Sequence, residues 1–222
     1  EKTHGGRGKL LGGVPGVRPA DVTIIGAGVV GTNATQIALG MGANVMILDI
    51  NTDRLRYLEQ VMRGRLTTLS ANPLTIAEGV KWADLLVGAV LVKGAKAPRL
   101  VTRAMVGTME AGSVVVDVSV DQGGCIETIR PSTHSDPVYV EEAVVHYGVT
   151  NMPGAVPRTS TYALSNATLP YLMKLAEHGI LGAIHKDKTL ARGVNTYLGK
   201  TTYDAVAETF GLEYTPLESI VS

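Results

Sequence analysis

Four residues near the start of the chain have the types and spacing that bind a dinucleotide. Gly26, Gly28 and Gly31 follow an apolar run in the pattern G-x-G-x-x-G, and Asp49 ends the next apolar run. Gly26 permits a tight turn, Gly28 lets backbone N–H groups approach a pyrophosphate, and Gly31 lets helix and strand pack closely. A carboxylate at position 49 can accept both ribose hydroxyls of adenosine and would repel a 2′-phosphate, which favours NAD over NADP. The alternative is a plain strand–helix–strand turn with Asp49 as a solvated strand end.

Alternating strands and helices must position these residues. Short apolar runs predict strands at 22–25, 44–49, 66–69, 85–90, 113–118 and 144–149. Helices are predicted at 29–39, from a cap at Thr52 or Asp53 to about 62, from Pro73 onward and at 102–109. This alternation predicts an α/β fold with a doubly wound parallel sheet of Rossmann type. Ligands of such sheets bind at the carboxyl ends of the strands, where 26–31, Asp49, 89–91, 119–124 and 151–152 should converge.

The pattern changes after Pro157, where 159–179, 188–198 and 202–210 are predicted to be helices without intervening strands. Formal charges balance to a net +0, so neither nucleic acid nor an anionic membrane is expected as a partner. Cys125 is the single cysteine, which excludes a disulfide within the chain and favours a cytoplasmic location. No apolar run reaches the roughly 20 residues of a membrane span, no signal peptide is expected, and the histidines lack metal-ligand spacing.

Four segments go beyond a generic dinucleotide fold. They are 5–16 (GGRGKLLGGVPG), 89–98 (AVLVKGAKAP), 116–125 (VDVSVDQGGC) and 145–160 (VHYGVTNMPGAVPRTS). Through them the sequence resembles the L-alanine dehydrogenase family along essentially the whole chain. The related transhydrogenase α subunit shares the glycine turn. The resemblance implies reversible, NAD-dependent oxidative deamination of L-alanine to pyruvate and ammonia, a role in L-alanine catabolism, and a homo-oligomer, which in the family is usually a hexamer.

The resemblance implies that Asp121, in the DQGG segment, lies beside nicotinamide and substrate and takes part in proton transfer; the alternative is that it caps a turn. Asp117 is assigned a structural role because it lies earlier in its strand. The Asn151 amide could donate to a carboxamide or to a substrate carbonyl, whereas an ordinary turn is the alternative. The glycine motif and the resemblance together give these cofactor contacts: Gly26, Gly28, Val29, Val30, Gly31, Asp49, Arg54, Ala71, Val90, Leu91, Val118, Ser119, Val120, Asp121, Arg130, Val149, Thr150, Asn151 and Met152.

Other titratable residues are given structural roles: His134 in a turn before Pro137, His146 packed within its strand, and Cys125 as buried filler. The family places a substrate domain before the segment where this sequence starts. We therefore expect 1–158 to be the NAD-binding Rossmann domain and 159–222 to be the helical C-terminal part of the substrate domain. The chain alone is expected to bind NAD but to oxidise alanine poorly. Two other functions stay open, a non-catalytic NAD-binding module and a transhydrogenase-type nucleotide domain with a membrane partner.

Overall fold

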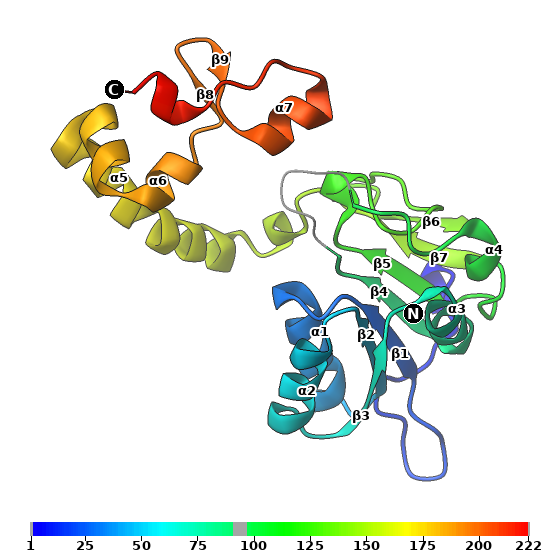
Figure 1. Cartoon of the computed structure of the whole chain (residues 1–222). Coiled ribbons are helices and arrows are strands. Elements are labelled where there is room, and N and C mark those ends of the chain that lie inside the picture. Colours follow the sequence, from blue (N-terminus) through cyan, green and yellow to red (C-terminus); the bar gives the residue numbers. More distant parts are fainter. Residues whose placement is uncertain (1, 91–96, 222) are drawn as a thin grey trace. The chain divides into compact units, whose positions relative to one another are not determined.

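The computed structural model describes residues 2–90 and 97–221, which form two compact units (Figure 1). The described residues of the first unit are 2–90 and 97–152, and those of the second are 153–221. We describe each unit by itself.

A seven-stranded sheet forms the centre of the first unit, in the order β3-β2-β1-β4-β5-β7-β6. The strands are β1 (Asp21–Ile25), β2 (Asn44–Asp49), β3 (Arg65–Ser70), β4 (Leu85–Gly88), β5 (Val114–Asp117), β6 (Val138–Glu141) and β7 (Val144–Tyr147). All neighbouring strands are parallel except β6 and β7. The doubly wound sheet that the sequence predicts is confirmed.

Strand β6 is the element of this sheet that the sequence reading missed. It pairs antiparallel with β7 at the edge of the sheet, and the two strands are joined by Glu142 and Ala143, which have φ angles of 52° and 58°. Neither residue is a glycine, so the usual sequence signal for a tight hairpin is missing. The predicted strands 85–90 and 144–149 also end earlier than expected, at Gly88 and Tyr147.

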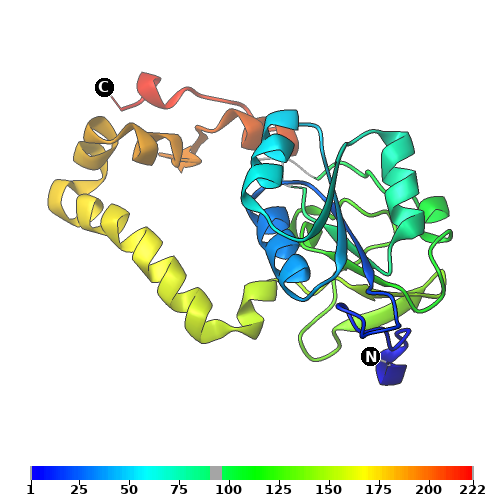
Figure 2. The same ribbon diagram turned by 90° about the horizontal axis from the view of Figure 1, so that it is seen from below.

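Helices cover both faces of the sheet (Figures 1 and 2). Helices α1 (Val29–Gly40) and α2 (Thr52–Val61) pack on one face, and α3 (Pro73–Trp82) and α4 (Arg103–Val106) on the other. The cap expected for α2 at Thr52 or Asp53 is wrong, because the Asn51 side chain accepts from the backbone N–H groups of Asp53 and Arg54. Helix α4 is shorter than the predicted 102–109, since it forms a single turn capped by Thr102. Short 3₁₀ helices lie at Lys2–His4, Val120–Gln122 and Met152–Ala155.

The sheet is buried on both faces, as expected of parallel strands. Neighbouring residues in one strand face opposite sides, so Ile24 packs in the apolar cluster with α1 and α2 while Ile25 packs in the cluster beneath α3. Both side chains are at most 1% exposed. This two-sided core fixes the strands, and therefore the loops at their carboxyl ends.

The glycine-rich segment that opens the chain is anchored at the amino end of the sheet. Asp84, immediately before β4, pairs with the side chains of Arg7 and Lys9 and accepts from the backbone N–H of Asp21 at 2.8 Å. Because β1 and β4 both begin here, this ion cluster lies at the edge opposite the carboxyl ends of the strands. The segment 5–16 that carries part of the family resemblance therefore serves the fold.

The second unit is mostly helical, as predicted, but not entirely. It contains α5 (Pro157–Lys186), α6 (Lys188–Arg192), β8 (Thr196–Tyr197), β9 (Lys200–Thr201), α7 (Asp204–Phe210) and a 3₁₀ turn at Leu217–Ser219. The prediction of one helix over 188–198 and of no strand is wrong. The helix stops at Arg192, and Leu198 and Gly199, with φ angles of 48° and 76°, turn β8 back onto β9 as a hairpin.

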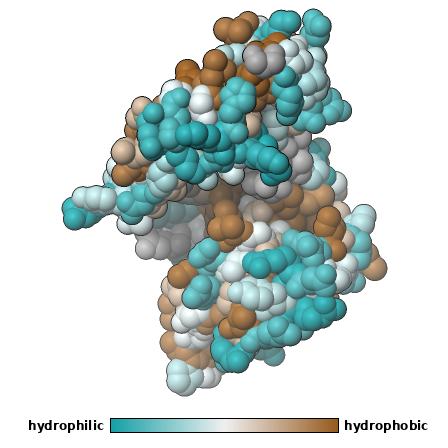
Figure 3. Space-filling model, turned by 60° about the vertical axis from the view of Figure 1, so that its left-hand side comes forward, coloured by the Kyte–Doolittle hydropathy of each residue, from teal (hydrophilic) through white to brown (hydrophobic). Residues whose placement is uncertain are grey.

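Helix α5 is interrupted at Gly179, whose φ of 66° lies outside the helical region. Many apolar side chains of this unit are on the surface; they include Tyr162, Leu164, Leu172 and Ile180, each about three-fifths exposed. Figure 3 shows hydrophobic residues, in brown, at the surface of the molecule. A small cluster of Ile184, Leu217 and Val221 forms the buried core of this unit. No helix in the described part of the chain is both long and apolar enough to cross a membrane.

Candidate functional site

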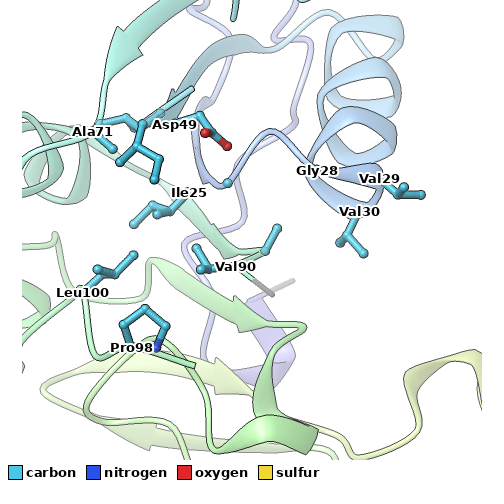
Figure 4. A pocket seen from close by; sticks show the side chains of 13 residues that line it. Ile25, Gly28, Val29, Val30, Asp49, Ala71, Val90, Pro98 and Leu100 are labelled. Atoms are coloured by element: carbon cyan, nitrogen blue, oxygen red, sulfur yellow. The ribbon is translucent and has the colours of Figure 1, made fainter. Parts of the chain in front are cut away.

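A cleft of about 540 Å³ lies at the carboxyl ends of β1, β2 and β4. This volume is within the range of pockets that hold small-molecule ligands and cofactors. Figure 4 shows Asp49 and the start of α1 on one side of the cleft, with Val90, Pro98 and Leu100 on the other. The lining residues are Ile25, Gly26, Gly28, Val29, Val30, Leu48, Asp49, Ile50, Ala71, Ala89, Val90, Pro98 and Leu100. Seven of the sequence-predicted contacts thus lie together here: Gly26, Gly28, Val29, Val30, Asp49, Ala71 and Val90.

The three glycines of the turn differ in what surrounds the position of a Cβ atom. Gly26 has a φ of 102°, and a Cβ there would lie 2.5 Å from the carbonyl oxygen of Ala89. A Cβ on Gly31 would lie 1.7 Å from the carbonyl oxygen of Gly26, so the turn can close onto α1 only with glycine at that position. Gly28 differs, because a Cβ on it would meet nothing within 4 Å. The space beside Gly28 opens at the start of α1, where backbone N–H groups and the helix dipole favour an anion such as a pyrophosphate.

Asp49 and Arg54 hold the peptide between the first two glycines. The Asp49 carboxylate accepts from the Ala27 backbone N–H at 2.6 Å and from the Asn51 N–H at 2.7 Å. The Arg54 guanidinium donates to the Ala27 carbonyl at 3.0 Å and to the Thr32 hydroxyl at 2.8 Å. Both charged side chains therefore fix the turn. A carboxylate oxygen can accept more than one hydrogen bond, so Asp49 keeps capacity for ribose hydroxyls.

The loop after β5 is organised by a buried carboxylate. Asp117 is fully buried, and its oxygens accept from the backbone N–H groups of Ser119 at 2.9 Å, Cys125 at 2.8 Å and Ile126 at 3.0 Å. Gly88 and Gly124 leave room for it, since a Cβ on either would approach an Asp117 oxygen to 3.0 or 2.9 Å. The structural role that the sequence reading gave Asp117 is consistent with this geometry. Its carboxylate fixes the ends of the loop that carries Asp121.

Replacing Asp117 by asparagine should lower the free energy of unfolding by about 2 kcal/mol at pH about 4, because an amide cannot accept on both sides. Burial raises the pKa of Asp117, against the opposing effect of the Ile126, Ser119 and Cys125 N–H groups. A raised folded-state pKa means that this carboxyl contributes less stability as pH rises through that pKa. The difference between wild type and Asp117→Asn should therefore shrink towards pH about 8. Urea unfolding at both pH values measures it, and a difference that grows with pH would contradict the assignment.

Cys125 is buried against the same carboxylate. Burial, followed by the charge of Asp117, raises the pKa of the Cys125 thiol to about 12. The thiolate is the reactive form, so we expect Cys125 to resist a thiol reagent at pH about 8 in the folded protein and to react once urea unfolds it. Rapid labelling of the native chain would show that the thiol is accessible. The sequence reading of Cys125 as buried filler is confirmed.

Asp121 and Asn151 come together although they are far apart in the sequence. Asp121 is exposed in the 3₁₀ turn Val120–Gln122, and the backbone N–H of Asn151 donates to its two carboxylate oxygens at 3.3 and 3.4 Å. Ser119, from the same loop, donates through its hydroxyl to the Val90 carbonyl at 2.7 Å, and Val90 lines the cleft. The loop that carries Asp121 is thereby tied to the cleft.

The other predicted contacts have varied places. Val118 and Val120 flank Ser119, and Val149 is fully buried. Thr150 donates its backbone N–H to Ser132, and Met152 begins the turn Met152–Ala155. Arg130 places its guanidinium 3.9 Å from the centre of the Tyr139 ring. Leu91 lies outside the described residues.

The predicted roles of two histidines compare differently with the structure. His146 is fully buried, contacts the Thr128 hydroxyl at 2.7 Å and stacks on Tyr139, so its predicted packing role is confirmed. His134 was predicted to lie only in a turn, yet its Nε2 lies 3.1 Å from the Asn151 carbonyl oxygen.

Several apolar residues that line the cleft were not predicted from the sequence. Ile25 could have been found because it ends β1, and Ile50 because it follows β2, whereas Leu48, Pro98 and Leu100 carry no such signal.

Known proteins are similar to this chain in sequence and in fold. Alanine dehydrogenase from Methanococcus maripaludis is 56% identical over 100% of this chain and 60% of its own length. The enzyme from Staphylococcus haemolyticus is also 56% identical, over 98% of this chain and 59% of its own length. The chain thus spans about three-fifths of the curated relatives that it matches.

Solved structures of related proteins have a similar fold. An L-alanine dehydrogenase superposes with a TM-score of 0.87 at 53% identity, over 95% of this chain and 58% of that chain. A transhydrogenase from Sinorhizobium meliloti shares the fold, with a TM-score of 0.71 at 24% identity over 91% of this chain and 56% of that chain. The family model for the alanine dehydrogenase/PNT C-terminal domain matches residues 1–204, and the chain belongs to this family.

Proposed function

We propose that this chain is the cofactor-binding part of an enzyme that oxidises L-alanine to pyruvate and ammonia, reversibly. NAD is the cofactor of this family, and the open side of Gly28, the uncapped start of α1 and the Asp49 carboxylate all fit a dinucleotide. The observation that carries the proposal is the meeting of Asp121 with Asn151 beside the cleft, from loops that follow two neighbouring strands.

NAD, when bound, supplies the acceptor for the hydride that leaves the alanine Cα. The residues of the glycine turn would hold its pyrophosphate, and Asp49 its adenosine ribose. Asp121 is exposed, so its carboxylate can take a proton from substrate or water. The Asn151 N–H donates to that carboxylate and orients it.

Other parts of the proposal concern the whole protein. The relatives are longer than this chain, and we propose that a substrate domain supplies the groups that hold the alanine carboxylate. Residues 159–222 would belong to that domain, and 1–158 would form the NAD-binding domain. A cytoplasmic homo-oligomer, a hexamer as in the family, completes the proposal.

Titration of the chain with NADH, followed by nucleotide fluorescence, tests the first step. We expect saturable binding, and binding of NADPH weakened at least tenfold because its 2′-phosphate would meet Asp49. The second step adds an N-terminal substrate domain from a relative in trans and follows alanine-dependent NADH formation at alkaline pH. Absence of NADH binding would overturn the proposal, and binding without alanine dependence would favour the non-catalytic module.

A further inference from the structure

The backbone at Asn151 adopts a conformation that needs support. Its φ of 52° lies in the left-handed region, which residues other than glycine rarely occupy, although asparagine tolerates it better than most. The Asn151 N–H lies 3.3 and 3.4 Å from the two Asp121 carboxylate oxygens, and φ sets how the next peptide, which carries the Asn151 carbonyl, is turned relative to that N–H. Both distances are at the long end for N–H···O bonds, so a small rotation of the peptide would break them.

His134 contacts the other side of the same residue. Its Nε2 lies 3.1 Å from the Asn151 carbonyl oxygen. A carbonyl only accepts, so Nε2 must carry the proton and donate. The backbone of Asn151 is therefore held at both polar groups, by a carboxylate at its N–H and by an imidazole at its carbonyl.

The position of His134 is itself fixed by the edge of the sheet. Ser132 exchanges backbone hydrogen bonds with the end of the β7 segment, donating to Gly148 at 2.9 Å and accepting from Thr150 at 3.2 Å. A turn follows, in which the Thr133 hydroxyl accepts from the Asp136 N–H at 3.1 Å. His134 lies within this turn. The pairing of Ser132 with the segment after β7 therefore places the His134 ring beside Asn151.

We infer that His134 is a positioning residue, which fixes the Asn151 carbonyl and thereby the left-handed backbone of Asn151, so that the N–H of the same residue orients the Asp121 carboxylate. The inference rests on the proposed function for its catalytic meaning, since Asp121 is the proton acceptor there. Within the described residues, His134 forms no hydrogen bond with Asp121 or with the residues that line the cleft. Its effect would pass through the backbone of one residue.

The test compares three variants of the chain by NMR. His134→Leu removes the donor, His134→Gln keeps an N–H donor of similar reach, and Ser135→Ala changes the neighbouring residue of the same turn as a control. A strong NOE between the amide proton and Hα of Asn151 marks the left-handed backbone. We expect it in wild type, His134→Gln and Ser135→Ala, and we expect it to weaken in His134→Leu. Amide exchange at Asn151 should accelerate about tenfold in His134→Leu, the size of one hydrogen bond.

Affinity for NADH gives an independent readout. Because Asn151 is itself a predicted cofactor contact, we expect His134→Leu to bind NADH about fivefold more weakly and His134→Gln to stay within about twofold of wild type. An unchanged NOE and unchanged exchange in His134→Leu would overturn the inference, even if the chain binds NADH. Failure of wild type to bind NADH would overturn the proposed function instead, because the NMR readouts need no nucleotide. Should His134→Leu unfold, His134→Asn serves in its place, since its shorter amide cannot reach the carbonyl.

Discussion

Replacing Gly31 by alanine is expected to destabilise the first unit by about 3 kcal/mol and to abolish measurable NADH binding. A Cβ at this position would lie 1.7 Å from the carbonyl oxygen of Gly26, well inside van der Waals contact. Neither atom can move alone, because Gly26 donates to the Leu48 carbonyl at 2.8 Å and the adjacent Ala27 is held by Asp49 and Arg54. The substitution must therefore push α1 away from β1. Urea unfolding and an NADH titration measure the two effects.

Gly28→Ala is the matched control, with the same change of one methyl group in the same turn. A Cβ on Gly28 meets nothing within 4 Å, so the free energy of unfolding should change by less than about 1 kcal/mol, the scale of an N-cap substitution. Affinity for NADH should nevertheless fall about tenfold, because the methyl group would occupy space that the pyrophosphate needs. If Gly31→Ala were as stable as Gly28→Ala, the close packing of the turn onto α1 would be refuted.

Asp121→Asn is expected to lower alanine oxidation by about a hundredfold or more once the substrate domain is supplied, because an amide cannot accept a proton. Affinity for NADH should stay within about threefold of wild type, since the side chain keeps its size and an oxygen that can accept from the Asn151 N–H. The rate of alanine-dependent NADH formation at saturating substrate measures the effect. A large loss of rate with little change in NADH affinity would identify Asp121 as a group that transfers protons rather than one that binds the cofactor.

A carboxylate elsewhere on the same domain provides the comparison. Asp53 is exposed at the start of α2 and pairs with Arg56 at 2.5 Å. Asp53→Asn should leave the rate and the NADH affinity unchanged, because surface ion pairs contribute little. Equal loss of activity in both variants would point to a general effect of charge and remove Asp121 from the proposed mechanism.

Much of the fold followed from local patterns. The continuous apolar runs that became β1 and β2 are short enough for strands and too apolar for an exposed face, so a parallel sheet was the consistent reading. Asn72 and Pro73 marked the start of α3 because their chemistry acts locally: the Asn72 side chain accepts from the N–H groups of Leu74 and Thr75. Such signals depend on few residues and survive without knowledge of the rest of the chain.

The strands that were not predicted from the sequence are short and lie in hairpins. The β6 strand is short and pairs only at the edge of the sheet, through a hairpin of Glu142 and Ala143 without glycine. The hairpin of β8 and β9 likewise turns at Leu198, whose sequence fits a helix as well as it fits a turn. In the second hairpin, pairing with a neighbouring strand outweighed the helical interpretation, whereas Val138, Tyr139 and Val140 favour a strand by themselves, so β6 could have been predicted.

By itself the sequence determined the dinucleotide turn, since Gly26, Gly28, Gly31 and Asp49 act through spacing along one continuous segment. The family followed from motifs of the same local kind. Sequence reasoning also predicted that 119–124 and 151–152 converge at the carboxyl ends of the strands. Only the tertiary structure added His134 to Asp121 and Asn151 and set the contacts among them, because these depend on the order of β5, β7 and β6 in the sheet. Hydrogen bonds of about 3 Å between distant residues require a finished sheet, and no pattern along the chain encodes them.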